Sequence, residues 1–122
     1  MNQPEHIEAK ALFQWVTLME QSRPEFKLFF ACPNGGNRNL KTAVKLKAEG
    51  VRAGVSDYIM LVARKPYHGL VIELKPIKGG RVQDNQQEFL DNAAAQGYRA
   101  EVARGWEAAK DIILNYLQGP KW

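Results

Sequence analysis

Two residues of one short segment have side chains that could do chemistry together. Glu73 and Lys75 are two apart in a segment typical of a β-strand, so both side chains leave the same face of that strand. An acid and a base on an aliphatic strand are costly to bury unless they are paired or bind a metal ion. The opposite face carries the aliphatic residues that a core requires, namely Leu70, Ile72 and Leu74.

A second acid, Asp57, stands directly before the preceding apolar run, after the turn formed by residues 54–56. We expect the two segments to pair antiparallel across a loop at 64–68. In the register that we assume, Asp57 lies opposite Lys75 and diagonal to Glu73, roughly 7–8 Å away. A slip of two residues would instead place Asp57 directly opposite Glu73.

Two carboxylates and a lysine at the end of a sheet suit a hard divalent cation. Mg²⁺ takes oxygen ligands, keeps several waters and needs only one or two protein carboxylates beside a substrate phosphate. Lys75 could then orient a water molecule or offset the charge that grows in the transition state. On geometry alone, an ordinary ion pair of Lys75 with Asp57 or Glu73 at a solvent-exposed sheet end is the alternative interpretation.

These residues must be positioned by one folding unit, for which we expect a single α/β domain over residues 1–122. The 58–62 run is continuously apolar, which is typical of a strand covered on both faces. Asp84 is expected to cap the third helix, with Gln87 in the reciprocal capping position. The domain would contain a small mixed β-sheet flanked by helices. The expected order is helix 5–22, strand 28–32, helix 39–49, strand 58–62, strand 69–75, helix 84–96, strand 99–103 and a terminal helix over 106–117.

Composition excludes several classes of protein. The chain has 122 residues, 45% of them hydrophobic and 25% charged, as in ordinary globular proteins, so disorder of the whole chain is excluded. Its single cysteine, Cys32, excludes an intramolecular disulfide and a Cys-rich zinc site, and favours a reducing, cytoplasmic location. No apolar run approaches the roughly 20 residues that span a bilayer, so we expect no membrane partner.

The net charge of +4 is concentrated in the middle of the chain. Residues 38–52 and residues 64–81 each carry five basic side chains against one acid. This distribution favours an anionic partner such as nucleic acid, although solvated surface lysines would give the same count. In the second segment the charged residues are Arg64, Lys65, Lys75, Lys78 and Arg81, against Glu73.

The motifs Gly54-Val55-Ser56-Asp57 and Ile72-Glu73-Leu74-Lys75 resemble the nuclease core known as PD-(D/E)xK. Ser56 stands where the superfamily name has proline, and it is equally small and compatible with a turn. More narrowly, the chain is similar to the VRR-NUC (virus-type replication-repair nuclease) family, in its stand-alone phage and bacterial form. Further matching features are Glu8, Pro33-Asn34-Gly35-Gly36 with Arg38, Lys47-Ala48-Glu49-Gly50-Val51, Gly69, Lys78-Gly79-Gly80-Arg81, Gln86 and Gly97-Tyr98.

The resemblance implies a role for each matching residue. Asp57 and Glu73 would bind Mg²⁺ or Mn²⁺ together with the backbone carbonyl of Leu74, and Lys75 would be the catalytic lysine. Glu8 and Gln86 would support the site from two helices. Without the resemblance, both would be interpreted as ordinary surface residues.

The remaining polar features are consistent with a path for DNA. Glycine lets a backbone approach a phosphate closely, so Asn34, Gly35, Gly36, Gly79 and Gly80 could offer N–H groups, although simple tight turns would explain both Gly-Gly pairs. Basic side chains would add salt-dependent, sequence-tolerant contacts with phosphates. These are Arg38, Lys41, Lys45, Arg52, Lys78 and Arg81.

The resemblance therefore implies a Mg²⁺- or Mn²⁺-dependent endodeoxyribonuclease that hydrolyses phosphodiester bonds and leaves a 5′-phosphate. Stand-alone members resemble Holliday-junction resolvases, whose paired cuts in four-way DNA would need a homodimer of this one-site chain. The alternatives are a nuclease for flaps or other branched DNA, and a non-catalytic nucleic-acid-binding module on the same fold. Either would act in the cytoplasm of a bacterial or phage-infected cell, in DNA repair or phage replication.

Overall fold

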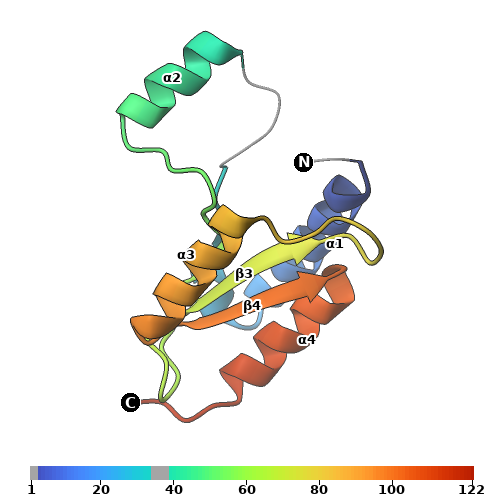
Figure 1. Ribbon diagram of the computed structural model, residues 1–122. Coiled ribbons are helices and arrows are strands. Elements are labelled where there is room, and N and C mark those ends of the chain that lie inside the picture. The colour runs from blue at the N-terminus through green and yellow to red at the C-terminus, as the bar shows by residue number, and fades with distance from the viewer. Residues whose placement is uncertain (1–2, 34–38) are drawn as a thin grey trace.

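A computed structural model of the chain describes residues 3–33 and 39–122, and its elements follow the expected order with one short helix added. The added element is a 3-10 helix that begins at Pro24. Figure 1 shows the arrangement. The elements are α1 (Gln3–Glu20), η1 (Pro24–Leu28), β1 (Phe29–Ala31), α2 (Leu40–Ala48), β2 (Tyr58–Met60), β3 (Leu70–Lys75), α3 (Asp84–Ala95), β4 (Arg99–Arg104) and α4 (Trp106–Leu117).

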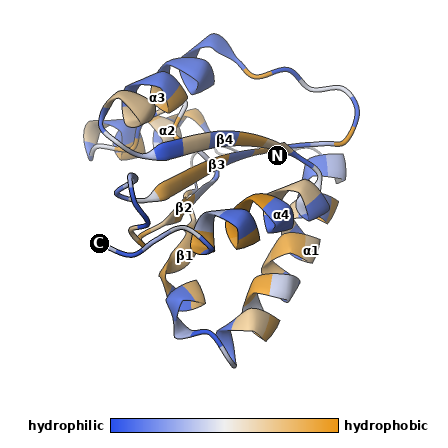
Figure 2. Ribbon diagram, turned by 90° about the horizontal axis from the view of Figure 1, so that it is seen from below, coloured by the Kyte–Doolittle hydropathy of each residue, from blue (hydrophilic) through white to orange (hydrophobic). Residues whose placement is uncertain are grey.

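The four strands form one mixed sheet in the order β1-β2-β3-β4. β1 and β2 pair antiparallel, as do β2 and β3, whereas β3 and β4 are parallel and are joined through α3. In Figure 2, α3 lies on one side of the sheet, and α1 and α4 lie on the other. The expected mixed sheet flanked by helices is thereby confirmed.

The hydrophobic core lies between the sheet and the α1–α4 layer. Leu12 and Val16, four residues apart on α1, are fully buried, as helical spacing requires of a core-facing stripe. Ile113 of α4 is fully buried in the same cluster. Burying each large aliphatic side chain contributes roughly 1.5–3 kcal/mol. On β3 this face carries the three expected residues, Leu70, Ile72 and Leu74, each 0% exposed.

The register between β2 and β3 differs from the one assumed in the sequence analysis. Tyr58 pairs with Ile72, so continuing the ladder by one residue places Asp57 opposite Glu73 rather than opposite Lys75. The assumed register was wrong by two residues, and the alternative slip is the one present. Because the side-chain period of a strand is two, this slip leaves Asp57 on the same face as Glu73 and Lys75.

The start of α3 also differs from the expectation. Asp84 does not cap the helix, since Gln83 is the N-cap residue and forms the reciprocal capping box with Gln86 rather than Gln87. The Gln86 Oε1 atom accepts a hydrogen bond from the Gln83 backbone N–H at 2.8 Å, whereas the Asp84 side chain is fully exposed. The capping box therefore holds the Gln86 side chain at the N-terminal end of α3.

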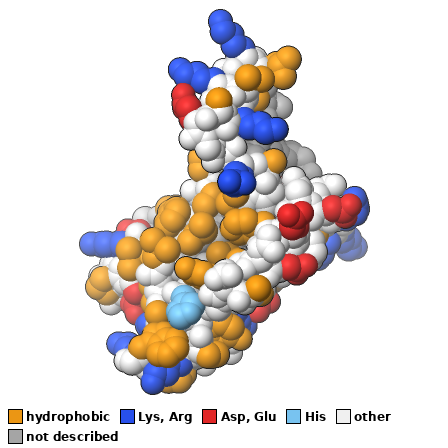
Figure 3. Space-filling view, turned by 60° about the vertical axis from the view of Figure 1, so that its left-hand side comes forward, with side chains coloured by type: hydrophobic (Ala, Val, Ile, Leu, Met, Phe, Trp, Pro, Cys, Tyr) orange, Lys and Arg blue, Asp and Glu red, His pale blue; other side chains and the backbone are white. Residues whose placement is uncertain are grey.

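β2 is shorter than expected, and it is not covered on both faces. In the described part of the chain, α3 packs mainly against β3 and β4, and much less against the β1–β2 half of that face. Leu61, which follows β2, is 56% exposed, and Phe30 of β1 is 40% exposed. Figure 3 shows apolar side chains gathered across the middle of this view.

α2 stands away from the sheet (Figure 1), and none of its residues is buried. Asn39 caps it, because its side chain accepts a hydrogen bond from the Thr42 backbone N–H at 2.8 Å. Among the residues that the structure describes, no helix has the length and apolar character that crossing a membrane requires.

Candidate active site

The two acids and the lysine come together beside α3. Asp57 immediately precedes β2, while Glu73 and Lys75 lie on the neighbouring strand β3. The Asp57 Oδ2 atom accepts a hydrogen bond from the backbone N–H of Leu74 at 2.8 Å. This bond fixes the Asp57 carboxylate against the segment of β3 that carries the other two side chains.

Gln86, in the first turn of α3, connects Glu73 and Lys75. Its Nε2 atom donates to Glu73 Oε2 at 3.0 Å, and its Oε1 atom accepts from Lys75 Nζ at 3.0 Å. The same Oε1 atom takes part in the capping box with Gln83. One side chain therefore starts the helix and orients two of the charged groups.

The charged side chains of this cluster are buried, and burial disfavours the charged form of a carboxyl group. Glu73 is 2% exposed and Lys75 is 5% exposed. Burial, followed by the nearby Asp57 charge, raises the pKa of Glu73 to about 8, and Lys75 opposes that shift. Burial also raises the pKa of Asp57, although the hydrogen bond from Leu74 works in the opposite direction. Two like charges beside one ammonium group favour either a shared proton or a further cation.

The residues fit a hard divalent cation. Glu73 Oε1 is buried and has no hydrogen-bond partner among the described residues, which is a costly state for a carboxylate oxygen and one that a metal ion would relieve. Within that part of the chain, no group of three or more His, Cys, Asp or Glu side chains could hold a metal. With two carboxylates as its side-chain ligands, a hard divalent cation here would take the rest of its ligands from carbonyl, water and phosphate oxygens.

The backbone carbonyl of Leu74 is directed toward Asp57. In a strand, successive residues turn their backbone groups alternately to the two neighbouring strands. The Lys75 carbonyl accepts from the Gly105 N–H on the β4 side, whereas the Leu74 N–H donates to Asp57 on the β2 side. The Leu74 carbonyl therefore also faces the β2 side, where a ligand beside Asp57 would lie.

The alternative of a solvent-exposed ion pair does not describe this arrangement. Lys75 Nζ lies 3.6 Å from Glu73 Oε2, which is longer than its 3.0 Å hydrogen bond to Gln86, and both charged side chains are buried. A buried pair gains little net stability, because desolvation offsets the attraction between the charges.

Among the described contacts, Glu8 makes no hydrogen bond or ion pair with Asp57, Glu73 or Lys75. It belongs to α1 and lies near the C-terminal end of β3. Its Oε1 atom accepts a hydrogen bond from the Trp106 backbone N–H at 2.8 Å, and the preceding residue, Gly105, donates its N–H to the Lys75 carbonyl. The N-cap position of α4 is Gly105, which has no side chain to provide this bond. In the structure Glu8 therefore caps α4, and a direct role in the chemistry stays a prediction.

The expected DNA-contacting residues fall into three groups. Residues 34–36 and Arg38 (Asn34, Gly35, Gly36 and Arg38) lie outside the described residues. Lys41, Lys45 and Arg52 are exposed on α2 or in the segment that follows it. Lys78, Gly79, Gly80 and Arg81 are exposed on the loop that joins β3 to α3, directly after Lys75. Only this last group adjoins the cluster along the chain.

Part of the expected basic surface belongs to the interior. Arg64 is 7% exposed and donates to the carbonyls of Leu117 and Ala63, with Glu25 Oε2 at 3.4 Å. Lys75 is buried as well, so two of the five basic side chains in residues 64–81 do not contribute to the surface charge. A charge count does not distinguish buried from exposed basic residues, so the count alone could not show that Arg64 is buried.

Two further residues next to the site escaped the sequence analysis. Gln83 caps α3, and Arg104 pairs in register with Lys75 at the end of β4. A glutamine N-cap is uncommon, and the residues of β4 do not predict its register with β3. The Asp84 signal for a cap was the more usual one, and it misled the assignment by one residue.

Comparison with known proteins identifies the family. The VRR-NUC domain profile matches residues 2–107. A solved structure described as a "VRR_NUC domain protein" superimposes with a TM-score of 0.84 at 29% sequence identity, and the match covers 99% of this chain and 93% of that one. The search of curated proteins gave no match. With its sheet, its paired acids and a profile match over most of its length, the chain belongs to the VRR-NUC family of nuclease domains.

Proposed function

We propose that this nuclease domain is a Mg²⁺- or Mn²⁺-dependent endodeoxyribonuclease that hydrolyses phosphodiester bonds in branched DNA. The observation that carries the proposal is the buried Glu73 carboxylate, one oxygen of which has no described partner, beside a second carboxylate and an ammonium group. A nucleic-acid-binding module would gain nothing from two acids at this position, because carboxylates beside phosphates weaken binding unless a cation lies between them.

Asp57, Glu73 and the Leu74 carbonyl would hold the metal ion. When bound, the ion would polarise the phosphoryl oxygen and make a nearby water molecule more acidic. Asp57 is kept in place for this role by the Leu74 N–H, and Glu73 by the Gln86 amide. Both carboxylates are therefore oriented before any substrate arrives.

Lys75 would act on the reacting phosphate itself. Its ammonium group is held by Gln86 and has further N–H donors available for a substrate oxygen or for water. In the reaction a water oxygen bonds to phosphorus, the bond from phosphorus to the 3′ oxygen breaks, and the product carries a 5′-phosphate. The positive charge of Lys75 offsets the negative charge that develops during this step.

The loop of residues 78–81 and the basic residues of α2 would hold the DNA backbone. A preference for four-way junctions, and for two symmetric cuts, requires two sites related by two-fold symmetry, so we propose a homodimer. Sedimentation of the purified protein tests this part separately, because a monomer would restrict the activity to single cuts in flaps or other branched DNA. A cytoplasmic location stays a prediction from cysteine usage.

The activity test incubates labelled duplex, flap and four-way DNA with the protein in Mg²⁺, Mn²⁺ or EDTA. We expect metal-dependent cutting, most of it in branched substrates. Asp57→Asn and Glu73→Gln should abolish cutting, because each removes a negative charge from the metal site. The matched control is Glu101→Gln on β4, an acid whose carboxylate lies 2.8 Å from Arg99 Nε, away from the cluster.

Cutting that persists in EDTA, or in both acid variants, would disprove the mechanism. Tight DNA binding without cutting in either metal would instead assign the protein to the binding-module class. Equal rates on duplex and branched DNA would leave the nuclease but remove the preference for branched substrates.

A further inference from the structure

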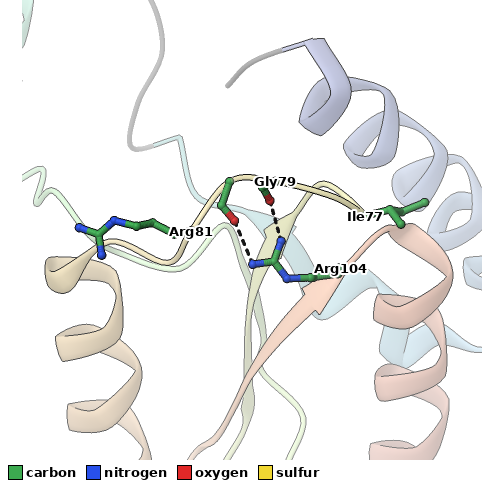
Figure 4. A pocket seen from close by; sticks show the side chains of 5 residues that line it. Ile77, Gly79, Arg81 and Arg104 are labelled. Atoms are coloured by element: carbon green, nitrogen blue, oxygen red, sulfur yellow. Dashed lines mark hydrogen bonds between the residues drawn. The ribbon is translucent and has the colours of Figure 1, made fainter.

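A shallow depression of about 350 Å³ lies beside the active-site cluster, at the C-terminal ends of β3 and β4. The loop after β3 and the last residue of β4, Arg104, form its walls. Figure 4 shows the Arg104 guanidinium group directed at the backbone of this loop. The lining residues are Ile77, Gly79, Gly80, Arg81 and Arg104.

The Arg104 guanidinium binds three carbonyl oxygens of this loop. Nη1 donates to Gly79 O at 2.7 Å and to Pro76 O at 3.2 Å, and Nη2 donates to Gly80 O at 2.9 Å. Gly79 and Gly80 have φ values of +76° and +63°, a left-handed conformation that side-chain-bearing residues rarely adopt. Because glycine loses more conformational freedom than any other residue when it is fixed, two glycines in succession gain from support outside the loop. A planar guanidinium fork can provide it, whereas a single ammonium group cannot engage three acceptors in the same way.

The anchored loop connects two parts of the catalytic cluster. It begins directly after Lys75 and leads through Arg81 into Gln83 and the first turn of α3, from which Gln86 reaches Glu73 and Lys75. Arg104 is itself the register partner of Lys75 across the β3–β4 ladder. A change in the position of this loop is therefore passed on to residues on both sides of it.

We propose that Arg104 is a positioning residue for the nuclease reaction, holding the 76–81 loop so that Arg81 and Lys78 meet the phosphate backbone of the DNA. This inference rests on the proposed function. Arg104 acts through the loop and not by touching the substrate, because most of its hydrogen bonding is directed to the loop carbonyls. Arg81 is free to reach a phosphate, since its side chain is 70% exposed and its nearest described partners, Gln83 and Asp84, lie 3.5 and 3.9 Å away.

The test is a double-mutant cycle between Arg104→Ala and Arg81→Ala. DNA affinity is measured as a function of salt concentration, with Ca²⁺ replacing Mg²⁺, and KM and kcat are measured separately in Mg²⁺. Arg81→Ala alone should weaken binding and lower the salt slope by about one, as expected for one lost phosphate contact. Arg104→Ala should weaken binding about tenfold through misplacement of the loop. In the Arg104→Ala background, Arg81→Ala should then change almost nothing.

Two further variants distinguish positioning from general destabilisation. Arg104→Lys keeps the charge but loses the fork, so it should resemble Arg104→Ala in KM, and amide hydrogen exchange should increase only over residues 76–82. Arg99→Ala is the matched control from the other end of the same strand, where Arg99 contacts Glu101 and Asn115. We expect its KM to equal that of the wild type, with thermal unfolding measured for every variant.

Independent, additive effects of the two arginine substitutions would overturn the positioning role. So would a wild-type KM in Arg104→Lys, because charge alone would then be sufficient. A wild-type protein that neither binds nor cuts DNA would refute the proposed function itself, and that result is distinguishable from a failed cycle in an active enzyme.

Discussion

The Asp57 carboxylate accepts a hydrogen bond from the backbone N–H of Leu74 at 2.8 Å. Asp57 is therefore held in place by β3, the strand that carries Glu73 and Lys75. An asparagine at position 57 keeps an oxygen that can accept this bond. The Asp57→Asn variant therefore removes the charge while keeping the side chain in place, and it separates metal binding from folding.

We expect Mg²⁺ to stabilise the wild-type protein and not Asp57→Asn. A ligand at ten times its Kd adds about 1.4 kcal/mol to the free energy of unfolding, which is about 5 °C in Tm for a chain of this length. Thermal unfolding with EDTA and with increasing Mg²⁺ measures this shift. Equal shifts in wild type and variant would show that the metal binds elsewhere.

The stability of the metal-free protein should fall with rising pH because of Glu73. Burial and the Asp57 charge raise the pKa of this carboxyl to about 8 in the folded protein, whereas about 4.3 is usual for an unfolded chain. A raised folded pKa contributes stability that is complete below the unfolded value and is lost as the pH approaches 8.

Glu73→Gln does not titrate, so in EDTA its stability relative to wild type should increase between pH 5 and pH 9, by an amount on the order of 4 kcal/mol. Urea unfolding at each pH measures the difference. Asp57 is present in both proteins, and its own raised pKa therefore contributes to both curves. Parallel curves for the two proteins would contradict this account of Glu73.

Gln86→Ala should impair both catalysis and folding. It removes the hydrogen bonds to Glu73 and Lys75 as well as the capping-box bond, and losing a cap costs about 1 kcal/mol. The matched control is Gln87→Ala, the next residue on α3, whose Nε2 atom donates to the exposed Asp91 carboxylate at 2.9 Å. Steady-state kinetics and urea unfolding should show normal turnover for Gln87→Ala, and similar losses in both variants would rule out the bridging role.

Gly54→Ala should displace the site, whereas Gly50→Ala should not. Both glycines have positive φ, +87° and +108°, so both substitutions strain the backbone. A Cβ on Gly54 would in addition stand 2.7 Å from the Asn85 carbonyl oxygen in α3, while a Cβ on Gly50 would meet nothing within 4 Å. We therefore expect Gly54→Ala to lose more stability and also activity. Equal activity in the two variants would show that the contact between the 54–57 turn and α3 is unimportant for the site.

Local patterns predicted the parts of the site that lie within one strand. The period of two put Glu73 and Lys75 on one face, and it did so irrespective of the pairing partner. The partner of Asp57 could not be fixed in this way, because β2 ends at Met60 and the length of the loop to β3 does not determine the register. Both registers kept the apolar residues inside, so hydrophobicity did not choose between them.

Contacts between distant segments account for the remaining differences. Glu8 is an acid on a helix in the sequence, and only the packing of α1 against α4 shows that it caps the latter. Arg64 contributes to a basic count in the sequence, and only the fold shows that it binds carbonyls inside the protein. In both cases the partner is far along the chain, and no local pattern carries that information.

The incomplete cover of one sheet face has a consequence for how a substrate enters. α3 packs against β3 and β4, and Glu73 is 2% exposed, whereas Asp57, directly before β2, is only partly buried. We therefore expect a DNA backbone that approaches from the β1–β2 side to meet Asp57 before Glu73, because Asp57 is the more accessible of the two acids.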